Sequence, residues 1–100
     1  MEFNELTDSQ LHEKLANGTE VEQMLLSNGW KVVLEAMKRV KKSQENSLRH
    51  IDPFKSPGDV VKAQNMIEVL DNFIPSLING IRQDGFIAFS TLQAKDEDLA

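Results

Sequence analysis

Apolar residues recur at alternating spacings of three and four through the segment 60–81. They are Val60, Ala63, Ile67, Leu70, Ile74, Leu77 and Ile81. This spacing is typical of a helix that buries one continuous stripe against a neighbour. A second stripe with the same alternation lies upstream and consists of Leu26, Trp30, Val33, Met37 and Val40. The two stripes predict two long helices that pack together.

The length and composition bound the size of the core and the class of protein. A chain of 100 residues is expected to form one small domain, burying about 65% of the surface that its unfolded chain exposes. It contains no cysteine, which excludes disulfides, thiolate nucleophiles and cysteine-ligated zinc. No segment approaches the ~20 apolar residues that span a bilayer. We therefore expect a protein of the cytoplasm that does not enter a membrane.

Capping signals set the expected start of the first two helices. Thr7 and Gln10 have the spacing of a capping box, flanked by the apolar pair Leu6 and Leu11. A short helix over 7–17 is predicted to end at Gly18, since glycine readily adopts the conformation that terminates helices. Thr19 and Glu22 have the spacing of a second capping box, so a long helix is predicted over 20–48. It is expected to pass through the Asn28-Gly29 dipeptide because the apolar stripe keeps its register there.

A connector over 49–56 precedes the strongest helix start in the chain. Ser56 stands at the cap position, Pro57 at the first helical position, and Asp59 in the first turn. A long helix is predicted over 57–82, kinked at Pro75, whose ring displaces a backbone carbonyl. The tail over 86–100 either docks on the hairpin, extends to a neighbour, or orders only on binding.

The expected fold is therefore all-α. It is an antiparallel hairpin of two long helices with a short N-terminal helix and a C-terminal tail, and it forms one domain over 1–100.

No residue constellation in the chain indicates a reaction. His12 and His50 are the only histidines, and neither has a second ligand at a spacing suited to a metal site. Nucleophile motifs and glycine-rich phosphate loops are also missing from the sequence. We therefore expect no enzyme activity, no catalytic or metal-binding residue, and no cofactor.

Basic residues gather on one face of the predicted helix 20–48, although the chain as a whole has a net charge of −5. Lys31, Lys38, Lys42 and Arg49 are spaced by seven, four and seven residues, and Arg39 and Lys41 widen the row. One interpretation is a solvated face in which Glu35 pairs with Arg39 and Glu45 with Arg49. The other interpretation is a binding face for an anionic partner.

The helix over 57–82 carries a second apolar flank that a single partner helix cannot cover. This flank consists of Val61, Met66, Val69, Phe73 and Ile78. Either the N-terminal helix and the tail cover it within one molecule, with Phe86 and Phe89 folded over Phe73, or a second subunit covers it. The residues expected at a protein interface are Met66, Val69, Phe73, Ile78, Phe86 and Phe89.

A local string in the sequence adds a family resemblance. The segment 25–33, which contains Gly29-Trp30-Lys31, is followed by a charged helix, an Asp-Pro connector and a helix that ends near an Ile-Pro pair. Over residues 25–75 this layout resembles that of small helical proteins encoded beside the head and packaging functions of tailed bacteriophages. The resemblance implies a role in particle assembly, through contact with virion proteins or the packaging apparatus.

These observations together predict a non-enzymatic helical interaction protein that forms a homo-oligomer. Its expected partners are itself and another virion or assembly protein, in the host cytoplasm or within the virion. The alternative is a nucleic-acid-associated regulatory or packaging accessory protein that uses the basic face of the helix 20–48.

Overall fold

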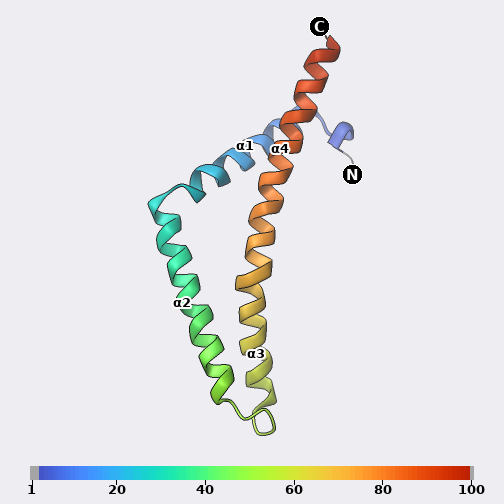
Figure 1. Ribbon diagram of the computed structural model, residues 1–100. Coiled ribbons are helices and arrows are strands. Elements are labelled where there is room, and N and C mark those ends of the chain that lie inside the picture. The colour runs from blue at the N-terminus through green and yellow to red at the C-terminus, as the bar shows by residue number, and fades with distance from the viewer. Residues whose placement is uncertain (1–2, 100) are drawn as a thin grey trace. The chain divides into compact units, whose positions relative to one another are not determined.

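The protein is described by a computed structural model that covers residues 3–99. Every regular element in that range is helical, which confirms the all-α prediction. The elements in Figure 1 are η1 (Phe3–Glu5), α1 (Asp8–Leu25), α2 (Asn28–His50), α3 (Pro57–Glu68), η2 (Val69–Phe73) and α4 (Ile74–Leu99).

The chain packs as two compact units, and the predicted simple hairpin is therefore wrong. The crossing unit combines the segment up to Ser27 with the segment from Leu77, and within it α1 packs against α4. The hairpin unit spans Asn28–Ser76 and contains α2, α3 and η2. The N-terminal helix and the segment predicted as a tail thus form a second helix pair.

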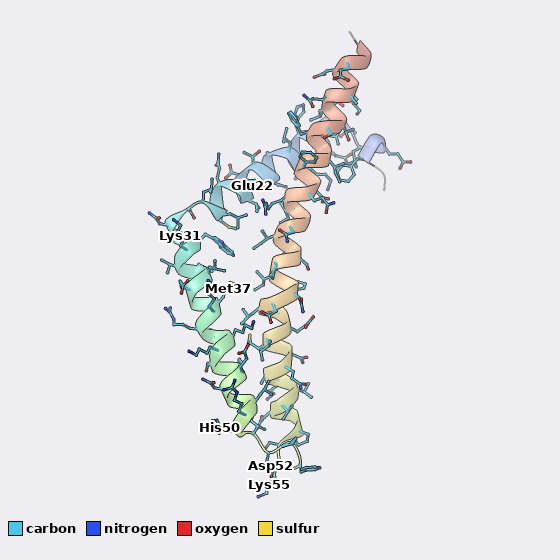
Figure 2. All side chains as sticks on the ribbon, in the orientation of Figure 1. Glu22, Lys31, Met37, His50, Asp52 and Lys55 are labelled. Carbon is cyan, nitrogen blue, oxygen red and sulfur yellow. The ribbon has the colours of Figure 1, made fainter. Side chains whose placement is uncertain are left out.

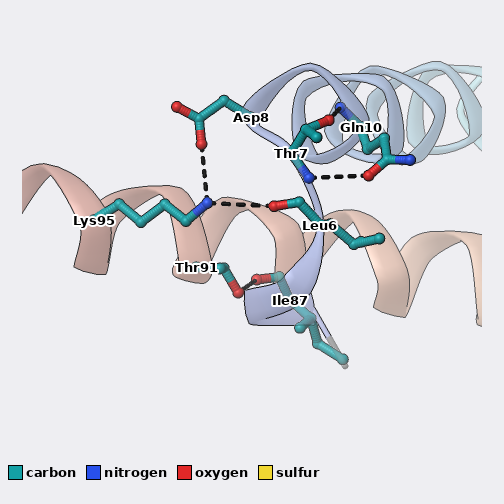
Figure 3. Close-up of polar contacts among 7 residues, drawn as sticks. All are labelled: Leu6, Thr7, Asp8, Gln10, Ile87, Thr91 and Lys95. Carbon is teal, nitrogen blue, oxygen red and sulfur yellow. Dashed lines mark hydrogen bonds and ion pairs between the residues drawn. The ribbon is translucent and has the colours of Figure 1, made fainter. Parts of the chain in front are cut away.

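The predicted capping box begins α1. The Thr7 N–H donates to Gln10 Oε1 at 2.9 Å, and the Gln10 N–H donates to Thr7 Oγ1 at 3.1 Å (Figure 3). Leu6 and Leu11, predicted to pack across this helix start, are both buried in one cluster with Ala88 of α4. The N-terminal end of α1 is therefore fixed by both local hydrogen bonds and tertiary packing.

Glycine has a different role in α1 from the one predicted. The helix continues through Asn17-Gly18 to Leu25, so the predicted short helix over 7–17 is wrong. Gly18 lies against Gly85 of α4 so closely that a Cβ built on Gly18 would be 3.0 Å from the Gly85 Cα. The absence of side chains at both positions therefore permits α1 and α4 to cross with their backbones in contact.

Thr19 does not cap a second helix, because its hydroxyl donates to the Leu15 carbonyl within α1 at 3.0 Å.

The chain breaks between α1 and α2 at Leu26 and Ser27, so the predicted unbroken helix over 20–48 is also wrong. The N–H groups of Leu26 and Ser27 donate to carbonyls three residues back, which tightens the end of α1. The Ser27 hydroxyl also donates to the Met24 carbonyl at 2.6 Å. Ser27, Asn28 and Gly29 follow one another, and all three residue types favour helix ends over helix interiors.

Charged side chains also connect the two helices of the crossing unit. Lys95 Nζ donates to Asp8 Oδ1 at 2.9 Å and lies 3.4 Å from the Leu6 carbonyl oxygen (Figure 3). Lys14 Nζ lies 3.7 Å from Asp84 Oδ2. The Lys95 contacts attach the start of α1 to the last turns of α4, and the Lys14–Asp84 pair joins the middle of the two helices.

Helices α2 and α3 run antiparallel in the hairpin unit and are joined by residues 51–56 (Figure 1). Asp52, labelled in Figure 2, organises this connector: its Oδ1 accepts from the Phe54 N–H and its carbonyl accepts from the Ser56 N–H, each at 2.9 Å. The start of α3 at Pro57 is confirmed, but the Ser56 side chain makes no capping hydrogen bond, and the connector begins at 51 rather than 49.

The residues that face α2 from α3 are largely the predicted ones. Ala63 is buried, and Val60, Ile67, Leu70 and Ile74 are half-buried. The predicted stripe of α2 is confirmed in part: Trp30 and Met37 are half-buried, whereas Leu26, Val33 and Val40 are exposed. The other half-buried residues of the facing stripe include Leu34, Lys41 and Leu48. Lys41, rather than the neighbouring Val40, belongs to this stripe, and its long side chain reaches across to Asp71.

The predicted interruption at Pro75 takes the form of the π-helical segment η2. The Ile74 N–H donates to the Val69 carbonyl five residues back, which makes room for a proline that has no N–H. Beyond it, Ile78 and Ile81 are half-buried while Leu77 is exposed, since a π turn adds a residue to the helical repeat. Helix α4 then passes through Gly85, which was predicted to end it, and continues to Leu99.

Candidate interaction surfaces

The two sides of the hairpin unit differ in chemistry. Val33 and Val40 each precede a facing residue of α2. Met66, Val69 and Phe73 each precede a half-buried residue, which lies in α3, in η2 and at the start of α4, respectively. In two antiparallel right-handed helices, positions one residue before the facing stripe lie on the same side of the pair. We call these residues the apolar side: Val33, Val40, Met66, Val69 and Phe73.

All five residues of the apolar side are exposed, and Phe73 is 62% exposed. The ion pair between Lys41 and Asp71 fixes the register of the hairpin, with Nζ and Oδ1 2.8 Å apart. Val40 therefore lies at about the level of Val69 and Phe73, and these last two line an open hollow together with Asn65, Glu68, Asn72 and Ser76.

The opposite side of the hairpin unit carries the predicted basic row. Lys31, Lys38, Lys42 and Arg49 each follow a facing residue of α2, so they share the flank opposite Val33 and Val40. We call these four residues the basic edge. Arg39, the next residue after Lys38, points further outward. All five side chains are exposed, as the sequence predicts.

The predicted intrahelical ion pairs form with different partners. Glu35 pairs with Lys38 at 3.5 Å, and Glu45 pairs with Lys41 at 3.7 Å. Within residues 3–99, none of Lys31, Arg39, Lys42 and Arg49 has an ion-pair partner. The basic edge is therefore only partly neutralised within the chain.

Lys41 bridges the two helices of the hairpin. Its hydrogen bond to Asp71 raises the pKa of the Lys41 ammonium above its ordinary value, while partial desolvation acts in the opposite direction. Asp71 belongs to η2 and follows Leu70, so it is placed on the side of the basic edge. A mixed-charge contact therefore separates the basic edge from the hairpin interior.

This raised pKa gives an expected pH dependence. The charged form is favoured by folding, so its contribution is complete below the ordinary pKa of 10.5 and is lost as the pH rises through the folded pKa. We expect the wild-type protein to lose more stability than Lys41→Met between about pH 8 and about pH 11.5. Urea midpoints of both proteins at the two pH values measure this difference, and equal losses would show that the pair contributes nothing.

The other predicted interface residues belong to the crossing unit. Phe86 and Phe89 are exposed and Ile78 is half-buried. The two phenylalanines line an open hollow of about 210 Å³ over the Gly18–Gly85 contact. Glu22 and Arg82, joined by an ion pair, also line it. The structure thus brings Met66, Val69 and Phe73 together in one unit, and Phe86 and Phe89 in the other.

Sequence reasoning missed Val33 and Val40 as surface residues, because they fit the stripe assigned to the core. It also missed Phe54, which is 94% exposed in the connector. Both histidines are exposed. Within residues 3–99, no group of three or more metal-ligating side chains gathers, and no helix has the length and apolarity needed to cross a membrane.

Comparison with known proteins assigns no function. No family model, no curated protein and no solved structure matches this chain. The resemblance to bacteriophage proteins therefore stays a prediction, and the function is argued from the surfaces of the chain itself.

Proposed function

We propose that this is a non-enzymatic helical interaction protein that self-associates through the apolar side of its hairpin unit. The observation that supports this most directly is the near absence of a core in that unit. Ala63 is the only buried residue among residues 28–76, all of which the structure describes, and α2 has none. The five residues of the apolar side are all exposed.

A second copy is the occupant that best fits this surface. The apolar side is formed by two antiparallel helices, so two copies can pack hairpin against hairpin as an isologous four-helix arrangement. Completing the burial of one such side chain contributes on the order of 1 kcal/mol. The ten side chains of a pair thus contribute roughly 10 kcal/mol, against an association cost of about 4–15 kcal/mol. At the lower end of that cost about 6 kcal/mol remains, which corresponds to a dissociation constant of roughly 40 μM.

The setting of this assembly comes from the resemblance of residues 25–75 to proteins of bacteriophage head and packaging regions. On that basis we place the oligomer in the host cytoplasm or the virion, in contact with a virion or assembly protein. Co-sedimentation with purified particles, abolished by Phe73→Asp, would support this setting. Equal co-sedimentation of the variant would contradict a role for the apolar side in it.

Sedimentation equilibrium tests the self-association. In about 0.5 M salt, which screens charge interactions, we expect wild-type protein at about 100 μM to exceed the monomer mass of 11.3 kDa. Phe73→Asp should return it to that mass, because a charge in the centre of the apolar side cannot be desolvated cheaply. Val61→Asp is the matched control: Val61 is 52% exposed on α3, but it follows a facing residue and lies on the opposite side.

Circular dichroism should show unchanged helicity in both variants, since both side chains are exposed. A wild-type mass of 11.3 kDa, or equal loss of association in Phe73→Asp and Val61→Asp, would overturn the proposal.

Nucleic-acid association is the second candidate, and the unpaired cations Lys31, Lys42 and Arg49 favour it. Phosphate contacts made by such cations weaken steeply with salt. Asp71 pairs with Lys41 beside this edge and reduces its net positive charge. Replacing Lys38, Lys42 and Arg49 with glutamine should abolish retention on DNA at low salt if this candidate is correct.

A further inference from the structure

The two units of the chain have opposite net charges. The crossing unit contains ten Asp and Glu against three Lys and Arg, which gives −7. The hairpin unit contains eight Lys and Arg against six Asp and Glu, which gives +2. Within the hairpin unit, α2 alone has six basic and two acidic residues. Opposite charges are thus concentrated in separately packed parts of one small chain.

The outward face of α1 carries acidic residues at a spacing that the basic edge repeats. Leu11, Leu15 and Gly18 face α4, whereas Glu13 and Glu20 lie on the opposite, exposed face. Neither glutamate has an ion-pair partner within residues 3–99. Seven residues separate them, which is about 10.5 Å along a helix.

Two pairs within the basic edge have this same spacing of seven residues: Lys31 with Lys38, and Lys42 with Arg49. Either pair can therefore lie opposite both glutamates at once when the helices run alongside each other.

We propose that the basic edge of one copy docks on the outward face of α1 in a second copy. Glu13 and Glu20 are then paired with two cations of the basic edge, and the partly neutralised charges of both surfaces are satisfied. The contact joins two different surfaces, so it is heterologous. Charge complementarity of this kind accelerates encounter and fixes register more than it adds affinity.

The charged contact differs from the apolar contact in what it can build. An isologous apolar contact closes at a dimer, whereas a heterologous contact leaves one free surface of each kind at the ends of the assembly. If the apolar contact of the proposed function also forms, the two together join dimers into larger assemblies. The charged contact itself does not depend on the apolar contact, so the two are separable by experiment.

The first experiment distinguishes the charged contact from the apolar contact by its dependence on salt concentration. Screening shortens the range of charge interactions from about 10 Å at 0.1 M salt to about 3 Å at 1 M. We expect Phe73→Asp protein to self-associate at about 0.05 M salt and its dissociation constant to rise at least about tenfold by 0.5 M. Self-association of this variant that does not change with salt would overturn the proposal, as would a monomer at both salt concentrations.

Charge reversal then identifies the surfaces. Two double variants are made in the Phe73→Asp background. One carries Lys38→Glu and Lys42→Glu, and the other carries Glu13→Lys and Glu20→Lys. Each should abolish the low-salt association. An equimolar mixture of the two should restore a heterodimer, because each then supplies the surface complementary to the other. If Phe73→Asp does not weaken the association of the wild-type protein, the same charge reversals are made in the wild-type chain and their self-association is measured there. The charged contact can therefore be tested even if the proposed function is wrong.

The matched control alters the net charge by the same amount as Glu13→Lys with Glu20→Lys, but at other positions of the crossing unit. Glu5 and Asp96 are both exposed and lie outside α1, so Glu5→Lys with Asp96→Lys should leave association unchanged. Equal loss with the control would show a net-charge effect and overturn the docking surface. The proposal also fails if the mixture stays monomeric. Salt-sensitive binding of a fluorescent DNA duplex, with self-association unaffected by Glu13→Lys and Glu20→Lys, would assign the basic edge to nucleic acid instead.

Discussion

Replacing Gly85 with alanine is expected to lower the free energy of unfolding by about 1–3 kcal/mol. A Cβ at this position would lie 2.9 Å from the Gly18 Cα and 3.2 Å from the Lys14 carbonyl oxygen. Both neighbours are backbone atoms of α1, so neither can rotate away, and the two helices must separate. The loss of packing along the crossing outweighs the gain of up to about 1 kcal/mol that alanine brings to a helix interior.

Gly80→Ala is the matched control for this substitution. Gly80 lies in the same helix, and nothing comes within 4 Å of a Cβ built there. We expect this variant to gain about 0.5–1 kcal/mol from helix propensity alone. Urea unfolding of the three proteins at one concentration, followed by circular dichroism, compares the effects. Stabilisation by both substitutions would show that α1 and α4 do not cross in backbone contact.

The same two glycines show where sequence reasoning stops. Gly18 follows Asn17, and Gly85 follows Asp84, and each pattern is typical of a helix end. In the structure both lie inside helices, because their shared lack of a side chain is used at a crossing between residues 67 positions apart in the chain. Nothing local distinguishes a glycine that ends a helix from one that permits a crossing.

Signals that are satisfied locally were predicted correctly. The Thr7–Gln10 box and the Ser56-Pro57 start each depend on residues within a few positions of one another, and both begin helices where expected. The stripe over 60–74 was also correct, since every member is apolar and the periodicity is unambiguous.

Part of the α2 stripe was assigned wrongly, because two exposed positions in it, Val33 and Val40, carry apolar residues and a half-buried position carries a lysine. Val40 fits an apolar pattern better than Lys41 does, but Lys41 is half-buried and pairs with Asp71 across the hairpin. An ion pair between two helices, such as that of Lys41 with Asp71, is a tertiary contact, and hydrophobic periodicity does not predict it. Met66, Val69 and Phe73 were predicted as interface residues because their helix is apolar over more of its circumference than one neighbouring helix covers. Val33 and Val40, which belong to the same apolar side, were assigned to the core.

Replacing Leu11 with alanine is expected to lower the free energy of unfolding by about 2–5 kcal/mol. Leu11 is 0% exposed and is the largest fully buried side chain among the described residues. It packs with Leu6 and Ala88, so its removal leaves a cavity at the point where α1, its preceding segment and α4 meet. Few other buried side chains support this unit, and the loss is a large share of the 5–15 kcal/mol typical of a folded domain.

Leu26→Ala supplies a control with the same chemistry. Leu26 lies at the C-terminal end of α1 and is 81% exposed, so truncating it removes little buried surface. We expect a change of less than about 0.5 kcal/mol for this variant. Thermal unfolding at matched concentration should therefore separate the two by about 4–8 °C per kcal/mol of difference. Equal melting temperatures would mean that the Leu6–Leu11–Ala88 cluster does not form the core of the crossing unit, and the packing of α1 on α4 would have to be reassigned.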